Sequence, residues 1–575
     1  MSEEIEPQHL DDDFFKVIAG GDDLLAFLLA QSDSFKFSTV KFKADVDLYE
    51  IISANPVPGI TLLERKERGP KPDILKELNP TFDCSDIQFD KPVLFVSCEF
   101  TMHVDFQNVN FRQGVSFRFS KFHKGLSLIR IKAEGTSTFG LISNQSVMVL
   151  NSSFNVLDNL YTKVDVEGNF HIENTSFNSG LNLSGCKVTD QLNLISIKLN
   201  GILDLSQSSL GTLNLGSIRE PRVCCEVQDL NISRTEFQGQ VQFSDLNING
   251  TVSGQGAVFK ESIFFTNVNF NQHAYLTHTT INKSIYLENV CAKGNFSFYG
   301  ATFNAGVHFN EIDFSTANVS FTGSHINADL WIGSLLHKDA KVYSGTLNFH
   351  GAMISQTSIV RIFNLNNVMS PAGEIDFSNA LIKGLLDIRN VYVNKITFNG
   401  TVVTGNIQDN NSLQSAIADR NTARLLKHEA RRINNTISAL NYNKIEMKLY
   451  AKTVKVRQFA DWSMLKLNRI SNNYGSDWVW GMGFTMACGL ICYSIFNISI
   501  YGFGFFWADS WNFIYNDARF WSGFINYFWL PTGFNELARH GVVQGGIAGG
   551  IVFILGKILI AYGIYQTVSA FRKYI

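Results

Sequence analysis

Residues 168–210 read GNFHIENTSFNSGLNLSGCKVTDQLNLISIKLNGILDLSQSSL, and the apolar residues of this stretch recur at every eleventh position. Two series keep this step: Ile172, Leu183, Leu194 and Leu205, and Phe177, Val188, Leu199 and Leu210. Apolar and polar residues alternate around these positions, and Gly or Asn separates the alternating runs, as in short β-strands joined by turns. A fixed period in short strands predicts a solenoid, in which each coil buries its inward side chains against its neighbours.

The same period runs through residues 84–410. Phe95, Phe106, Phe117 and Leu128 keep it early in this region, and Leu276, Leu287, Phe298 and Phe309 keep it later. A single unit of this length is too short to circle an axis, so we expect each coil to contain two units. A leucine-rich repeat has the period of such a coil but carries one L-x-L unit per coil, whereas both halves carry that unit here. The pattern therefore favours a β-helix.

Two stretches of this region carry a family resemblance: FVSCEFTMHVDFQNVNFRQGVSFRFSKF (residues 95–122) and GNFHIENTSFNSGLNLSGCKV (168–188). They resemble the pentapeptide-repeat family, whose right-handed β-helices have four faces of five residues in each coil. The spacing here is 5+6 rather than 5+5, and large residues such as Leu181 stand where the family prefers small ones. Some members imitate DNA with an acidic rod, but lysines and arginines are mixed with the acids here. We therefore expect no nucleic-acid partner.

A basic region follows the repeat. Residues 411–474 contain no glycine, their apolar residues recur at helical spacing with a break predicted near 441–443, and residues 420–469 hold twelve Lys or Arg against three acids. Because the run precedes a long apolar stretch, the sequence predicts a basic helical juxtamembrane connector that meets anionic head groups. A solvated helix face is the alternative. The candidate membrane-surface residues are Arg424, Lys427, Arg431, Arg432, Trp462, Lys466 and Arg469.

Two apolar stretches end the chain. Trp478–Ala508 carries no charged residue, and Gly541–Phe571 carries only Lys557. About 20 apolar helical residues cross a bilayer core, so residues 475–575 are predicted to form a two-helix α transmembrane domain. Small residues let such helices approach closely, and the candidates for helix packing are Gly545, Gly546, Gly549 and Gly550. Two helices alone make a poor bundle, so we expect a homo-oligomer, with a tetramer as one option.

An aromatic segment, residues 509–540, lies between the two stretches. It contains the apolar run ARFWSGFINYFWL followed by Pro531, and it is either re-entrant or an amphipathic helix in the interface. The predicted order is a long helix, a short helix, a turn that contains glycine and a second long helix. Over about residues 478–571 this order resembles the two-span pore module of potassium-channel-like proteins. The resemblance implies a pore, for which the candidate residues are Thr532, Gly533, Phe534, Asn535, Glu536 and Lys557.

The likeness to a potassium filter is incomplete. The T-x-G-[YF]-G signature needs a second glycine, and this chain has Asn535 after Phe534, so we expect no potassium-type filter. Lys557 is interpreted either as a pore-lining cation or as a cation that meets head groups through helix tilt. A pore-lining lysine would disfavour the passage of cations.

Charge and resemblance together give the expected topology. The basic connector and Arg572 and Lys573 after the second stretch place both termini in the cytoplasm. The final run KILIAYGIYQTVSAFRKYI is similar to the tails of bacterial inner-membrane proteins that join pentapeptide repeats to two spans. The predicted fold is mixed, with a cytoplasmic β-helix solenoid, a helical connector and a two-helix transmembrane domain. Residues 1–83 are expected to form an acidic, helical cap.

The sequence favours a channel over an enzyme. It contains no phosphate loop, G-x-S-x-G elbow or H-E-x-x-H motif, and its twelve histidines and eight cysteines lack metal-ligand spacing, so we expect no catalysis, cofactor or metal. The expected function is an oligomeric channel-like or pore-forming protein controlled by the β-helix. The alternative is a membrane-anchored scaffold whose β-helix recruits a cytoplasmic protein without conduction. A weaker alternative is a defence effector that depolarises the membrane.

Overall fold

The computed structural model describes residues 16–18, 20–31, 33–42, 46–63, 81–157, 164–217, 225–310, 312–314, 317–333, 344–363, 371–410, 412–455, 457–501, 518–534, 537 and 547–571. The chain divides into two units. The first comprises residues 1–396 and 400–413, and the second comprises residues 397–399 and 414–575.

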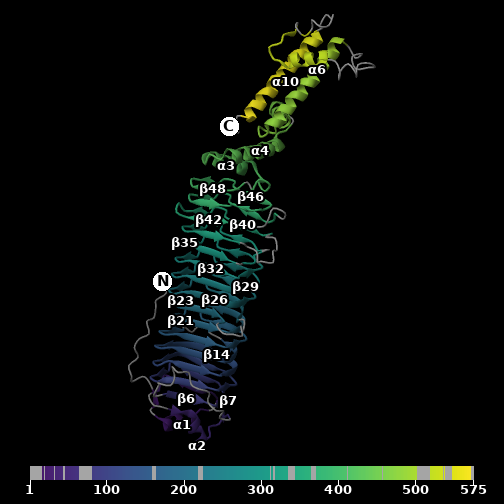
Figure 1. The fold of residues 1–575 in the computed structure, drawn as a ribbon. Coiled ribbons are helices and arrows are strands. Elements are labelled where there is room, and N and C mark those ends of the chain that lie inside the picture. Colours follow the sequence, from purple (N-terminus) through teal and green to yellow (C-terminus); the bar gives the residue numbers. More distant parts are fainter. Residues whose placement is uncertain are drawn as a thin grey trace. The chain divides into compact units, whose positions relative to one another are not determined.

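The first unit is the predicted β-solenoid, and its strands pair in parallel over residues 82–408 (Figure 1). One face consists of β6 (Thr81–Ser85), β10 (His103–Gln107), β13 (Leu126–Ile129), β15 (Val147–Leu150), β18 (Phe170–Glu173), β21 (Lys187–Ile195), β23 (Ser209–Gly216), β26 (Val241–Ile248), β29 (Ile263–Phe270), β32 (Ile285–Glu288), β36 (Val307–Asn310), β39 (Leu330–Ile332), β42 (Ile359–Ile362), β45 (Leu385–Asp387) and β48 (Asn406–Gln408).

The register of this face confirms a coil of two units. Val241 pairs with Ile263, Ile263 with Ile285, and Ile285 with Val307, so each partner stands two eleven-residue steps further along the chain. The step lengthens at Leu330, which pairs with Val360, and the parallel pairing then resumes. The excess residues therefore lie between strands and leave the stack continuous.

Residues in the left-handed conformation recur with the eleven-residue step. Ser97, Asn108, Phe119 and Arg130 have φ between 53° and 55°, and they occupy every eleventh position. This conformation is sterically unfavourable for L-residues, and Asn is among the residues that adopt it most readily. They stand two positions after Phe95, Phe106, Phe117 and Leu128, within the five-residue interval of each 5+6 spacing.

Columns of stacked side chains fill the core and continue on the outside. Phe100 stacks on Phe122 with ring centroids 4.9 Å apart, and Phe349 stacks on Phe377 at 4.8 Å. On the surface, Asn289 donates to Asn267 at 2.6 Å. At these positions neighbouring coils present the same residue type to each other at the spacing of neighbouring strands.

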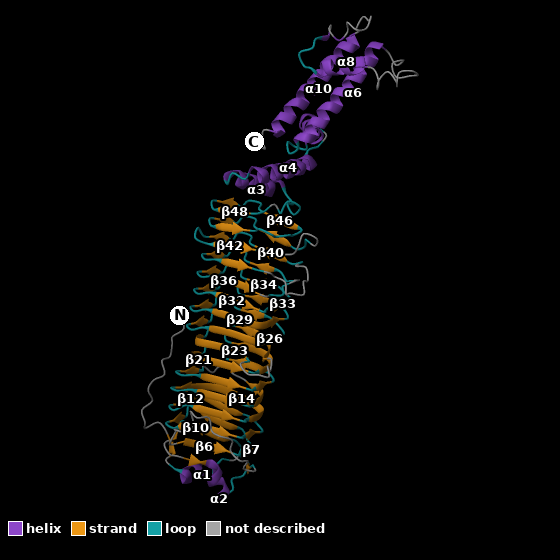
Figure 2. Cartoon of the chain, viewed as in Figure 1, coloured by secondary structure: helices purple, strands orange, loops and turns teal. Residues whose placement is uncertain are grey.

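The region predicted as an acidic, helical cap also supplies strands to the solenoid. β2 (Phe35–Ser38) pairs with β8 (Val93–Val96), and β3 (Val40–Phe42) pairs with β9 (Glu99–Phe100). Phe42 stacks on Phe100 at 4.6 Å, so the aromatic columns begin here. Helices α1 (Gly21–Leu29) and α2 (Leu48–Ala54) lie at this end of the stack (Figure 2). The acidic tract at residues 11–13 lies outside the described residues.

The second unit is helical. Its helices are α3 (Arg420–Arg432), α4 (Thr436–Thr453), α5 (Phe459–Asn472), α6 (Trp478–Tyr501), α8 (Ala518–Phe528) and α10 (Ile547–Phe571). The predicted break near 441–443 is wrong, because α4 runs through it and the first break falls at residues 433–435. Asn434 has a φ of 58°, and the Asn435 side chain accepts a hydrogen bond from Ser438 N at 3.1 Å. This Asn pair forms the turn and the cap that separate the two helices.

Two phenylalanines on β12 (Val115–Phe122) test the account of the solenoid. Phe117 is buried and stacks on Phe95, so Phe117→Ala should lower local stability by about 3–5 kcal/mol. Phe119 is exposed at a φ of 54°, so Phe119→Asn should be neutral or stabilising. Native-state hydrogen exchange of the β12 amides measures both. Equal loss of protection in the two variants would contradict the stacked core.

Candidate functional site

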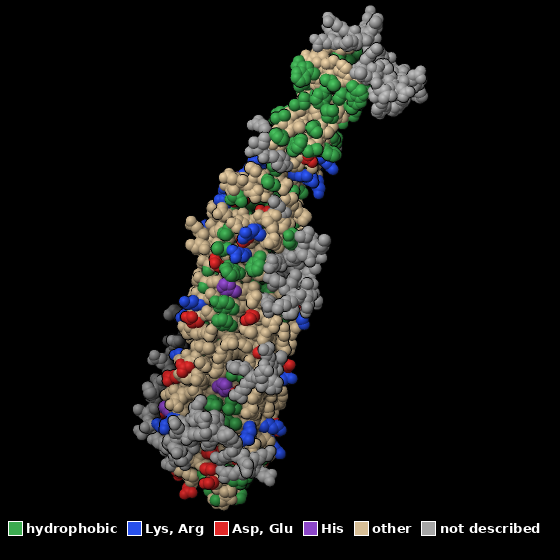
Figure 3. Space-filling model, viewed as in Figure 1, with side chains coloured by type: hydrophobic (Ala, Val, Ile, Leu, Met, Phe, Trp, Pro, Cys, Tyr) green, Lys and Arg blue, Asp and Glu red, His purple; other side chains and the backbone are tan. Residues whose placement is uncertain are grey.

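Helices α6 and α10 are long and apolar enough to cross a membrane. In the most apolar window of each, 28% of the α6 residues and 22% of the α10 residues are buried, so most of their apolar surface faces outward. Figure 3 shows hydrophobic side chains gathered over these helices and Lys and Arg side chains at the connector end. A core helix of a water-soluble protein would bury this surface, because large exposed apolar patches mark contact with a membrane or a partner.

The two helices meet along a seam of small residues. Gly481 faces Thr567, Gly563 faces Thr485, Gly556 faces Cys492, and Gly549 faces Ser499. A Cβ on Gly556 would lie 3.0 Å from Cys492 Cβ, and a Cβ on Gly563 would lie 3.0 Å from Thr485 Cβ. The small residues of α10 thus recur every seven positions, at Gly549, Gly556, Gly563 and Ala570, as in antiparallel helix pairs that pack closely.

The structure places the predicted packing glycines differently from one another. Gly549 lies in the seam, whereas a Cβ on Gly550 would meet nothing within 4 Å. Gly545 and Gly546 lie outside the described residues. Sequence reasoning concentrated on the dense glycines at the start of the helix and missed Gly556 and Gly563. A count of small residues at every seventh position would have found them.

Helix α8 packs against both long helices through an aromatic cluster. Tyr493 and Phe496 of α6, Phe520, Phe524 and Tyr527 of α8, and Ile560 of α10 are its buried members. Tyr527 is fully buried, and its hydroxyl occupies the space that a side chain on Gly556 would fill. Because Gly556 has no side chain, α6 and α10 can approach closely there and Tyr527 of α8 can pack against them.

The contacts of α8 and the turn after it show that the chain first runs along the helix pair toward the connector and then turns back. Phe520 packs on Tyr493 at 5.2 Å, and the Phe528 ring lies against Gly489, four residues nearer the connector. Beyond the turn, Phe534 packs on Phe496 at 6.0 Å, seven residues back along α6. Seven helical residues correspond to about 10 Å. Residues 518–534, which we call the hairpin, therefore dip beside the two helices and turn back.

The turn of the hairpin contains three of the predicted pore residues. Thr532 N donates to the Trp529 carbonyl at 3.2 Å, and Pro531 and Gly533 are exposed. Phe534 is half-buried against Phe553. Asn535 and Glu536 lie outside the described residues. The structure thus brings Thr532, Gly533 and Phe534 together at the turn.

Lys557 reaches the same turn from α10. Its Nζ donates to the Trp529 carbonyl at 2.5 Å and lies 5.3 Å from the Phe553 ring and 5.6 Å from the Tyr527 ring. A cation at the C-terminal end of a helix complements the helix dipole, and ring faces attract it further. Lys557 therefore holds the end of α8 against α10. It stands ten residues after Ile547, about 15 Å along the helix.

A polar network joins the connector to the other end of the helix pair. Asn468 Oδ1 accepts from Tyr562 OH at 3.0 Å and from Gln566 Nε2 at 3.2 Å, while Asn472 Nδ2 donates to Gln566 Oε1 at 2.5 Å. Trp480 Nε1 donates to the Ile470 carbonyl at 2.8 Å. These amide contacts couple any displacement of α5 to α10.

The predicted membrane-surface residues fall into two groups. Arg424 and Lys427 of α3 hydrogen-bond the buried carboxylate of Glu446 on α4, so these two cations tie the connector helices together. Arg432 bonds the buried Glu429 at 2.6 Å within α3. Arg431 is exposed. Trp462, Lys466 and Arg469 lie apart from them on α5, around a pocket.

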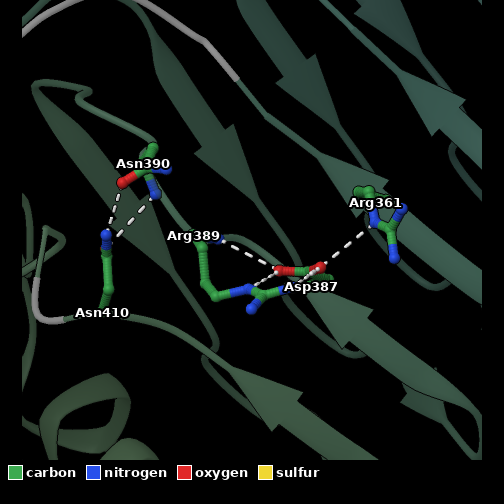
Figure 4. Close-up of polar contacts among 5 residues, drawn as sticks. All are labelled: Arg361, Asp387, Arg389, Asn390 and Asn410. Carbon is green, nitrogen blue, oxygen red and sulfur yellow. Dashed lines mark hydrogen bonds and ion pairs between the residues drawn. The ribbon is translucent and has the colours of Figure 1, made fainter.

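A polar cluster on the last coils of the solenoid is shown in Figure 4. The buried Asp387 accepts from Arg361 Nε at 3.1 Å and from Arg389 Nη2 at 2.8 Å. The hydrogen bonds from Arg389 lower the pKa of Asp387 despite its burial. This carboxylate, held as an anion by two guanidinium groups, joins neighbouring coils through the bond to Arg361. Within the described ranges, no three His, Cys, Asp or Glu side chains form a metal site.

The seam can be tested with two glycines of α10. Gly563→Leu should push α6 and α10 apart and destabilise the pair by about 1–3 kcal/mol, because Thr485 occupies the space. Gly550→Leu is the matched control and should have little effect, since its Cβ meets nothing. Thermal unfolding of the purified protein in detergent micelles measures the difference. Equal melting temperatures for the two variants would contradict the seam.

The connector should respond to acid through Glu446. Burial raises the pKa of Glu446, but the hydrogen bonds from Lys427 and Arg424 outweigh this effect. The net result is a pKa below the usual 4.5. The stabilisation is therefore present above pH 4.5 and is lost as the pH falls through the lower folded pKa. Glu446→Gln should cost about 2 kcal/mol at pH 7, because the partners are partly exposed. Melting curves against pH check this, and an unchanged acid transition in Glu446→Gln would contradict it.

Comparison with protein-family models, curated proteins and solved structures found no match to this chain. Its function therefore has to be argued from the geometry of the site.

Proposed function

We propose that this chain is an oligomeric, channel-like inner-membrane protein of bacterial type. In this proposal α6 and α10 cross the bilayer, the hairpin lines a water-filled path, and a cytoplasmic solenoid related to pentapeptide repeats controls it. One observation carries the proposal: the exposed, irregular backbone of the hairpin turn lies beside the middle of the two apolar helices.

A bilayer core limits where irregular backbone can lie. Exposed Pro531 and Gly533 interrupt helical structure at the depth of Lys557, about 15 Å from Ile547. A bilayer core is about 30 Å thick, so this depth is close to its middle. Irregular backbone at that depth is tolerated where it is covered by protein or lines a water-filled cavity. The exposed turn therefore favours water or a neighbouring subunit beside it over lipid alone.

The outer face of the hairpin supports an oligomer. Side chains of α8 and its end that point away from α6 and α10 are apolar and exposed: Trp521, Ile525, Trp529 and Leu530. In lipid, helices associate by close packing rather than by exclusion from water. A neighbouring subunit that covers this face would also cover part of the turn. The subunits would then meet around the hairpins.

The position of Lys557 argues for a weakly selective pore. A potassium filter presents stacked carbonyl groups to the ion. Here the Trp529 carbonyl at the end of α8 already accepts from an ammonium group. The positive charge beside the turn disfavours a cation there. We therefore propose no potassium selectivity and a path that admits anions more readily.

A membrane-anchored scaffold is the second candidate. The outer face of the solenoid carries a column of aromatic side chains, with Phe264 stacked on Tyr286 at 5.0 Å and Tyr286 on His308 at 5.1 Å. Trp331 continues the column, and Arg361 lies 5.5 Å from its ring. An exposed column of this kind favours a protein partner. A scaffold, however, gives no reason for the hairpin.

Ion flux through liposomes that contain the full-length protein separates the two candidates. We expect flux with the unmodified chain. Flux through Thr532→Cys should fall at least about tenfold when a charged thiol reagent reacts at the turn, because the added group would occupy the path. Ile554→Cys, on the exposed lipid-side face of α10, is the matched control and should conduct unchanged.

Two results would contradict the channel. One is the absence of flux from a reconstituted oligomer, which would favour the scaffold. The other is equal inhibition at Thr532 and Ile554, which would show that the reagent acts on the bilayer or on the whole helix pair rather than on a path at the turn. The unsubstituted chain treated with the same reagent accounts for the native cysteines.

A further inference from the structure

Four cations surround a pocket at the end of the connector. The pocket has a volume of about 320 Å³ and is lined by Lys448 and Lys452 of α4 and by Lys466 and Arg469 of α5, with the Trp462 and Tyr474 rings between them. Residues three or four apart share one face of a helix. Two helices therefore present their cations to the same space.

In the part of the chain that the structure describes, these cations have no acidic partner of their own. None of the four forms an ion pair there, whereas the connector's two buried acids, Glu429 and Glu446, already bind cations of α3. The neighbouring Lys444 also responds to these charges: its pKa is lowered, first by burial and then by the charge of Lys448. Cations that the fold holds this close to one another favour an anion between them.

The rest of the lining is amphipathic. Ala451, Val454 and Leu465 supply aliphatic surface, and Lys466 lies 5.6 Å from the Trp462 ring. Burial raises the pKa of the Tyr474 phenol, so the hydroxyl keeps its proton and can donate. The volume is at the lower end of the range for small-ligand pockets. This combination fits a phosphate group attached to an apolar glyceride better than a fully hydrated ion.

The pocket also lies at the end of the apolar helix pair. Tyr474 precedes the start of α6 at Trp478 by four residues, and α5 is fixed to α10 through Asn468 and Asn472. If α6 and α10 cross a bilayer, this level is that of the head groups on the connector side. Trp478 and Trp480, both exposed, suit the same level.

We propose that this pocket binds the phosphate head group of an anionic phospholipid. The cations of α4 and α5 would contact the phosphate, and Val454 and Leu465 would contact the start of an acyl chain. The inference rests on the proposed function for the placement of α6 and α10 in a bilayer. It adds a ligand that sits between the connector and the helix pair, where lipid composition would bias their coupling.

The test measures lipid binding by full-length protein in detergent micelles that contain phosphatidylglycerol or phosphatidylcholine. Native mass spectrometry counts the bound lipids, and a melting curve of each variant confirms folding. We expect preferential retention of phosphatidylglycerol. Lys452→Gln with Lys466→Gln should weaken it by about 30-fold, as the loss of two cations near an anionic head group implies. Lys455→Gln with Arg457→Gln is the control, because it removes two exposed cations outside the pocket.

Equal loss in both double variants, or equal retention of the two lipids, would overturn the proposal. Glycerol phosphate and inorganic phosphate form a separate arm. If either displaces phosphatidylglycerol at micromolar concentration, the occupant is a soluble phosphate and the lipid assignment fails. The assay needs neither a bilayer nor conduction. A channel that fails the flux measurement can therefore still retain the lipid, and a conducting channel can fail to retain it, so the two failures are distinguishable.

Discussion

The packing of α6, α8 and α10 depends on one missing side chain. Gly556 lets α10 approach Cys492 of α6, and the same gap accepts the hydroxyl of Tyr527 from the hairpin. A larger residue at this position would separate the long helices and expel α8 at once. Two other contacts depend on this packing: the buried aromatic cluster and the bond from Lys557 to the Trp529 carbonyl. Both require the end of α8 to lie beside the middle of α10. The aromatic side chains of the hairpin and the gap at Gly556 together place it beside the two long helices.

The same helix pair connects two different environments. At the hairpin end its neighbours are the aromatic rings of α8, whereas at the connector end they include the amides of α5. Asn468 and Asn472 hydrogen-bond Tyr562 and Gln566, so α5 and α10 are joined at that end. A displacement of the connector would reach the hairpin along α10, since Lys557 lies on the same rigid helix. The control that we propose would use this route within the second unit.

Some features were predictable from the sequence because they repeat or depend on length. The solenoid follows from a step that recurs twice in every coil, and two candidate spans follow from long runs almost free of charge. Pairing between distant residues was not predictable in this way. Glu446 of α4 binds Arg424 of α3, so cations interpreted as membrane-facing are tied to a buried acid. The seam at Gly556 and Gly563 was not predicted, because its small residues recur only once in seven positions. The prediction relied instead on the closely spaced glycines near Gly549.

The depth of the hairpin turn tests the central claim most directly. A nitroxide label on Gly533→Cys fits the site, because a Cβ there meets nothing within 4 Å. Labels at Ile551 and Ile558, both exposed on α10, give reference depths in the same bilayer. Accessibility to oxygen and to a water-soluble nickel complex then reports depth for all three. We expect a Gly533 depth between those of Ile551 and Ile558. A Gly533 label at the head-group level would contradict it and make α8 an interfacial helix.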